Sequence, residues 1–111
     1  MSDSNAPRDF VREFERRLRV EPTRFSLVLY VAGATSRSLR AIENVRAVCE
    51  ELLRDRYELK IVDLYKNPGA ARDEQIVAVP TLVRKLPKPL RHAIGDLSSR
   101  ERLIASLGLA P

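Results

Sequence analysis

Apolar residues along the chain follow three patterns that predict a mixed α/β fold. Residues 25–32 (FSLVLYVA) are apolar at nearly every position, which is typical of a central strand buried on both faces. Residues 38–54 carry apolar side chains at three- and four-residue steps, as an amphipathic helix does. Residues 57–64 (YELKIVDL) contain β-branched residues and predict a second strand. Together these segments predict a βαβ unit with parallel strands and a right-handed crossover.

The segment after this unit predicts shorter elements. Asn67 and Pro68 are suited to cap a short helix that ends near Glu74. Residues 76–86 alternate in the manner of an edge strand, and residues 91–94 are a candidate hairpin partner for them. The sequence therefore predicts that the C-terminal half adds two strands to the sheet.

A last helix is predicted by a capping box. Ser98 and Glu101 have the spacing at which the two side chains cap a helix N-terminus reciprocally. The apolar residues of this helix are Leu103, Ile104 and Leu107. The complete order (strand, helix, strand, short helix, two strands, helix) predicts an α/β domain of the thioredoxin-like class over residues 25–111.

Residues 1–24 have the pattern of an N-terminal helical extension. Phe10, Phe14 and Leu18 recur at four-residue steps, and Pro22 ends the pattern because the residue before a proline avoids the helical region. We expect this helix to pack on the domain or on another subunit. A helix lying on a membrane surface fits less well, because its polar positions carry both signs of charge.

Composition bounds the chain to one small domain. It has 111 residues, of which 44% are hydrophobic and 32% are charged. No apolar run is long enough to span a bilayer, and the N-terminus has no apolar signal region. The single cysteine suits a reducing compartment, so we expect a cytoplasmic protein without a membrane association.

The net charge of +5 is concentrated near the C-terminus. Residues 84–111 carry six basic and two acidic residues, and Arg84, Lys85, Lys88 and Arg91 have no acid between them. Such a segment favours an acidic partner, either protein or nucleic acid, or else is a solvated loop. No aromatic residue lies between residues 66 and 111 to stack on bases, which favours a protein over a nucleic acid.

The sequence gives little support for a catalytic function. In a thioredoxin-like fold the turn before the first helix carries two cysteines, but here Thr35 and Ser38 stand near those positions, and alcohols do not exchange disulfides. Cys49 lies on the apolar stripe of the helix, where a free cysteine is usually a core residue. A triad of Ser98, His92 and Asp96 lacks a nucleophile elbow. With one histidine we expect no metal site, no cofactor and no enzymatic activity.

Four motifs in a fixed order resemble the KaiB family of the cyanobacterial circadian oscillator. They are LYVAGATSRSLRAI, YELKIVDLYKNP, IVAVPTLVRKLP and IGDLSSRE, and the resemblance runs from about Phe25 to Leu109. It implies a regulator that docks on the N-terminal ATPase ring of KaiC, a hexameric autokinase. It also implies displacement of a thioredoxin-like sensor-kinase domain and, where KaiA exists, sequestration of KaiA.

The resemblance also implies a chain that adopts two folds. KaiB proteins have a tetrameric ground state with βαββααβ topology and a thioredoxin-like monomer that binds KaiC. The half that changes begins here at about Asn67, and prolines in this half are associated with cis peptide bonds in the thioredoxin-like form. Pro80, Pro87 and Pro89 are the candidates in this chain. A homodimer or homotetramer is thus one expected state.

Partner-binding residues follow from the same resemblance. Arg40, Lys60, Arg84 and Arg91 match family positions implicated in partner contacts, and Lys85 lies within the same basic segment. Residues 106–109 read SLGL where clock members have GLDL, a segment that influences which fold is favoured. We therefore expect the thioredoxin-like form to dominate. The alternative function is a thioredoxin-like adaptor or sensor domain of a kinase system without KaiC.

Overall fold

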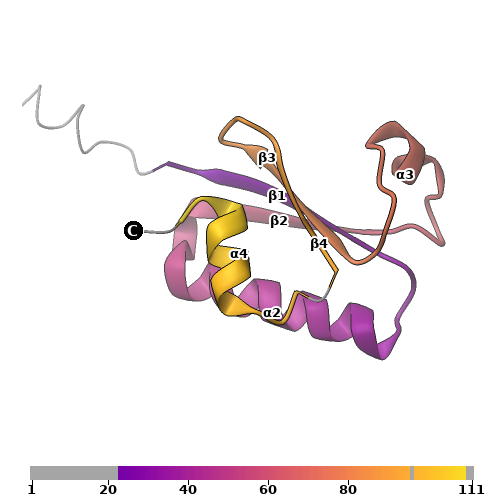
Figure 1. Cartoon of the computed structure of the whole chain (residues 1–111), viewed down its shortest axis with the longest axis horizontal. Helices are drawn as coiled ribbons and strands as arrows, with labels where there is room; N and C mark the ends of the chain where they lie inside the picture. Colours follow the sequence, from indigo (N-terminus) through magenta and orange to yellow (C-terminus); the bar gives the residue numbers. More distant parts are fainter. Residues whose placement is uncertain (1–22, 96, 110–111) are drawn as a thin grey trace, which may run out of the picture.

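The computed structural model describes residues 23–95 and 97–109, so the expected helix in residues 9–20 lies outside the described residues. The described chain forms one four-stranded sheet with helices beside it (Figure 1). The strands are ordered β2-β1-β3-β4 across the sheet. None of the described helices is long and apolar enough to cross a membrane.

The N-terminal half confirms the predicted βαβ unit. β1 (Phe25–Val31) and β2 (Tyr57–Asp63) pair in parallel, and α2 (Ser36–Leu52) connects them with the 3-10 turn η2 (Arg54–Arg56). The helix begins two residues earlier than predicted. The reason is that the side chain of Thr35 accepts a hydrogen bond from the Ser38 backbone N–H at 3.1 Å and caps the first turn.

The short helix and the strand after it differ from the prediction. Helix α3 (Gly69–Asp73) follows Pro68 as its cap, and this cap makes no side-chain hydrogen bond. Asn67 instead contributes its carbonyl oxygen, which accepts from the Ala70 backbone N–H. The strand β3 (Thr81–Leu86) is shorter than residues 76–86 and begins directly after Pro80, which has no N–H to donate to a strand ladder. The edge-strand interpretation is also wrong, since β3 lies between β1 and β4.

The C-terminal hairpin and helix agree with the predicted order. β4 (Arg91–Ile94) pairs antiparallel with β3, and α4 (Arg100–Leu107) follows it. The cap of α4 is Ser99 rather than Ser98, because Ser99 Oγ accepts from the Arg102 backbone N–H at 3.2 Å. Gly108 ends the helix with φ +73, a conformation that a residue with a side chain adopts at a cost.

Most of the core lies between the sheet and the pair α2 and α4, which cover one face of it (Figure 1). Its fully buried members include Leu29 of β1, Cys49 of α2 and Leu103 of α4. A smaller apolar cluster of Val28, Tyr30 and Val83 lies on the opposite face, where residues 62–79 supply its partly buried neighbours. The sheet therefore has one thickly covered face and one thinly covered face.

Candidate functional site

The turn between β1 and α2 is held in place from β2. Asp63 Oδ1 accepts hydrogen bonds from the backbone N–H groups of Gly33 and Tyr65, each at 2.9 Å. These two hydrogen bonds hold the pKa of the Asp63 carboxyl below its usual range, and the one from Tyr65 contributes most. Gly33 has φ +72, and a Cβ there would lie 2.8 Å from the Tyr65 ring. The positive φ favours glycine at this position, and any larger residue would also have to displace the exposed Tyr65 ring.

This turn carries no thiol, and the only cysteine lies elsewhere. Thr35 caps α2 and donates a hydrogen bond to the buried Ser38 hydroxyl at 3.0 Å. Cys49 is fully buried on α2, and burial raises the pKa of its thiol to about 11. A thiol in that environment is protonated at neutral pH and cannot reach a disulfide in solution. The geometry therefore gives Cys49 a packing role.

A hollow of about 430 Å³ opens at the same end of the fold. It lies between the first three turns of α2, Pro80 directly before β3 and Leu97 in the connection between β4 and α4. Its lining residues are Ser36, Arg37, Arg40, Ala41, Asn44, Pro80 and Leu97. Arg40 was expected from the sequence as a contact residue. Arg37 and Asn44 were not singled out, although their spacing from Arg40 places all three along one face of α2.

The three proline candidates occupy two places. The peptide bonds Val79–Pro80, Leu86–Pro87 and Lys88–Pro89 are all cis. Pro80 is buried at the rim of β3 and lines the hollow. Pro87 and Pro89 lie in the connection between β3 and β4, which is mostly exposed. A role for these prolines in a change of fold stays a prediction.

Arg84 lies inside the fold, although the sequence suggested a basic docking surface there. Its side chain is 6% exposed and points to the helix-covered face. The guanidinium donates to the carbonyl oxygens of Leu107 at 2.8 Å and Pro89 at 2.9 Å. Burial lowers the pKa of this guanidinium. Arg84 thus ties the end of α4 to the β3–β4 connection and presents no surface charge in this fold.

Gly108 makes room for that buried arginine. A Cβ at position 108 would lie 2.5 Å from Arg84 Nη1, and the positive φ of Gly108 already favours glycine. The glycine of the SLGL segment is therefore coupled sterically to Arg84. A larger residue at position 108 would therefore displace the Arg84 guanidinium in this fold.

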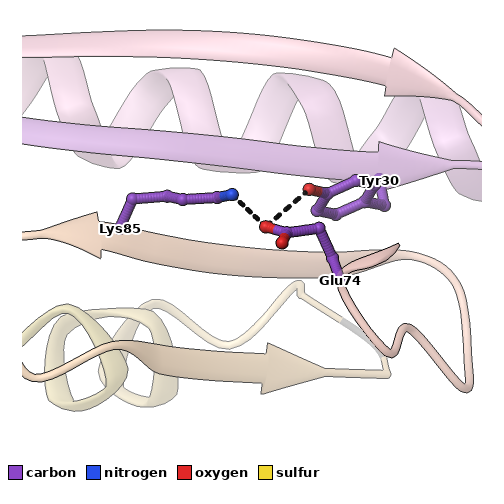
Figure 2. A network of polar contacts seen from close by, with 3 residues as sticks. All are labelled: Tyr30, Glu74 and Lys85. Atoms are coloured by element: carbon purple, nitrogen blue, oxygen red, sulfur yellow. Dashed lines mark hydrogen bonds and ion pairs between the residues drawn. The ribbon is translucent and has the colours of Figure 1, made fainter. Parts of the chain in front are cut away.

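Lys85 points to the other face of the sheet and belongs to a polar network (Figure 2). Its Nζ forms an ion pair with Glu74 Oε1, and the same oxygen accepts from the Tyr30 hydroxyl at 3.4 Å. The Lys85 hydrogen bond is the main reason why the pKa of Glu74 is lowered, and the pKa of Lys85 is raised in turn. The network fastens the segment after α3 onto β1 and β3.

The remaining basic residues are exposed but dispersed. Arg40 lies near the start of α2, Lys60 on the thinly covered face of β2, and Arg91 at the start of β4. Arg91 pairs with Arg84 across the hairpin, which directs it toward the helix-covered face. The five basic residues expected from the sequence therefore do not form one cluster. Arg40 lines the hollow beside α2.

Comparisons with known proteins assign the family. Residues 28–109 match the KaiB domain. The chain is 47% identical over 85 residues to a circadian clock oscillator protein KaiB of Prochlorococcus marinus (strain MIT 9303), covering 77% of this chain and 71% of that protein. It is 38% identical over 92 residues to circadian clock protein KaiB3 of Synechocystis sp., covering 83% of this chain and 90% of that protein.

Solved structures confirm the fold. The N-terminal domain of Synechococcus elongatus SasA superposes with a TM-score of 0.66 at 18% identity, over 82% of this chain and 90% of that domain. Mitochondrial thioredoxin 3 of Saccharomyces cerevisiae superposes with a TM-score of 0.62 at 16% identity, over 88% of each chain. The fold is thioredoxin-like, and by its sequence the chain belongs to the KaiB family.

Proposed function

We propose that this protein is a clock-type regulator that binds the N-terminal ATPase ring of a KaiC-like hexameric autokinase and modulates its phosphorylation cycle. The observation that carries the proposal is the 47% identity to a circadian clock oscillator protein KaiB over 85 residues. The match to the KaiB domain over residues 28–109 includes the turn at Gly33, the whole of α2 and the three prolines at 80, 87 and 89. In this proposal the protein acts by binding its partner rather than by catalysing a reaction.

Two features of the fold support a binding role. The hollow beside α2 is ligand-sized, and Arg40 at its edge is exposed and positively charged. The thinly covered sheet face offers Lys60 on β2, one of the two edge strands of the sheet. Charged residues at such positions steer association and select the partner more than they add affinity. A thioredoxin-like sensor-kinase domain would compete for the same site on the ring.

The test mixes the purified full chain with the KaiC-like ATPase of the same organism, first in ATP and then in ADP. Size-exclusion chromatography with light scattering should show a complex heavier than the hexamer in at least one nucleotide state. Phosphomimetic and phospho-null ATPase variants extend the test to the phosphorylation cycle. Absence of a complex in every state would refute the proposal. Binding to a sensor kinase but never to the ATPase would instead support an adaptor of a KaiC-independent kinase system.

A further inference from the structure

The hollow at the start of α2 combines an apolar floor with a cationic rim. Ala41 and Leu97 are 3% and 5% exposed, and Pro80 is buried beside them. Arg37 and Arg40 stand at the edge and are exposed. The volume of about 430 Å³ holds two or three side chains rather than a single ion. Its shape and lining fit a short stretch of polypeptide.

The two arginines of the rim lack acidic partners within the described part of the chain. The ion pairs that the structure describes join Lys85 to Glu74 and Arg100 to Glu51. No described acidic residue lines the hollow, and the first turn of α2 has none either. Two unpaired guanidinium groups one helical turn apart attract a carboxylate and can bind it with paired hydrogen bonds.

We infer that this hollow is a docking site for an acidic segment of a protein partner, with a carboxylate at Arg37 and Arg40 and an adjoining apolar side chain on Ala41, Pro80 and Leu97. The charge of the rim selects an acidic segment, and the apolar floor favours a peptide over a free anion. No aromatic residue of the described ranges 23–95 and 97–109 lines the hollow, so these residues offer no platform for a nucleic-acid base. The inference goes beyond the proposed function, because it holds whichever protein supplies the segment.

The test uses the full chain, labelled with ¹⁵N, and the acetylated and amidated hexapeptide GLEELG. Amide signals of residues 36–44, Thr81 and Leu97 should shift on titration. The glutamine counterpart GLQQLG should bind at least about tenfold more weakly, because it lacks the charge that the arginines recognise. Raising the salt concentration should weaken the GLEELG complex and leave the GLQQLG complex nearly unchanged.

Charge reversal at the rim provides the matched variants. The double variant Arg37→Glu/Arg40→Glu should lose at least about tenfold in affinity for GLEELG, as expected when paired Arg–carboxylate contacts become repulsive. Arg46→Glu changes an exposed arginine of the same helix outside the hollow, so its affinity should stay within twofold of the unmodified chain. If the double variant does not fold, judged by circular dichroism, Arg37→Gln/Arg40→Gln replaces it with the same expected loss.

Several outcomes overturn the inference. Equal affinity for the two peptides, shifts confined to other parts of the chain, or an unaffected double variant would each exclude a carboxylate site. The same variants also distinguish two other possible occupants of the hollow. Charge reversal that dissociates a homo-oligomer in sedimentation assigns the hollow to a second copy of the chain. Charge reversal that moves the amide signals of residues 1–22 in the free protein assigns it to the chain's own N-terminal segment.

Discussion

The two faces of the sheet are built differently from the same strands. Residues of β1 alternate, so that Leu27, Leu29 and Val31 face α2 and α4 while Val28 and Tyr30 face the other way. Among the residues that the structure describes, the helix-covered face buries thirteen in one apolar cluster, and the other face buries three. Burial of apolar surface dominates stability, so the helix-covered face supplies most of the folding free energy.

The thinly covered face depends on polar contacts as well. Helix α3 has five residues and none of them is buried, so its own packing fixes it weakly. Glu74, placed directly after it, joins this segment to β1 through Tyr30 and to β3 through Lys85 (Figure 2). The helix-covered face therefore supplies most of the stability of the fold, whereas the thinly covered face holds its covering segment in place with few contacts. Four substitutions test this division.

The largest loss of stability is expected from Leu29→Ala on the helix-covered face. Leu29 is 0% exposed, and truncation of a fully buried leucine costs about 3 kcal/mol through lost burial and the cavity left behind. The control is Val62→Ala on the thinly covered face, where a partly buried valine should cost about 1 kcal/mol. Urea unfolding followed by far-UV circular dichroism measures both. Equal losses would contradict the division of the core between the two faces.

Arg84→Met should be the next most damaging change. Methionine keeps much of the arginine stem but leaves the Leu107 and Pro89 carbonyl oxygens without their charged donor. We expect a loss of about 2 kcal/mol in the free energy of unfolding, together with faster amide exchange in residues 103–107. The exposed neighbour Arg91→Met should change stability by less than about 0.5 kcal/mol. A stable Arg84→Met protein with protected α4 amides would argue that apolar packing replaces the buried ion.

The helix-covered face could be predicted from the sequence in most of its parts. The continuous apolar run of β1 and the periodic apolar positions of α2 leave little freedom in where these elements pack. Even the burial of Arg84 had a signal. Arg84 is two residues after Leu82, so in a strand both side chains point to the core face. The run of basic residues around Arg84 favoured a surface position, so the alternation that places its side chain on the core face was not used.

The thinly covered face and the hollow could be predicted only in part. Alternation over residues 76–86 indicated a strand, but β3 begins only at Thr81, directly after Pro80, so the first five residues of the predicted strand lie outside it. The Glu74–Lys85 pair joins residues eleven apart on two elements. The hollow combines α2 with Pro80 and Leu97, so it depends on tertiary packing.

A smaller effect is expected from Glu74→Gln, with a clear dependence on pH. The lowered pKa of Glu74 means that the fold favours its carboxylate form. This stabilisation is complete above the ordinary value of 4.5 and is lost as pH falls through the lowered pKa of the folded state. At pH 7 the variant should lose about 0.5–1 kcal/mol, a modest amount because Glu74 and Lys85 remain about one-third exposed.

Unfolding in urea at a series of pH values between 7 and 3 measures this difference. The gap between the unmodified protein and Glu74→Gln should narrow below pH 4.5, because protonation removes the same ion pair. The matched control is Glu58→Gln, which changes an exposed glutamate of β2 on the thinly covered face of the sheet. It should change stability by less than about 0.3 kcal/mol. A gap that stays constant across this range would show that the Glu74 carboxylate does not fasten the segment after α3.

Lys60→Glu should have the smallest effect on stability, because Lys60 is an exposed residue on the thinly covered face. A change within about 0.5 kcal/mol is expected. The substitution tests whether the thinly covered face contacts the ATPase ring. If it does, charge reversal should slow association with the ring several-fold and make the association rate less dependent on salt. The dissociation rate should change less. Stopped-flow fluorescence or surface plasmon resonance at two salt concentrations separates the association rate from the dissociation rate.

Arg40→Glu, at the hollow on the helix-covered side, is the variant to compare with Lys60→Glu. Slowed association with Arg40→Glu alone would place the contact at the end of the fold, and slowed association with both would show that the ring reaches across the sheet edge to its thinly covered face.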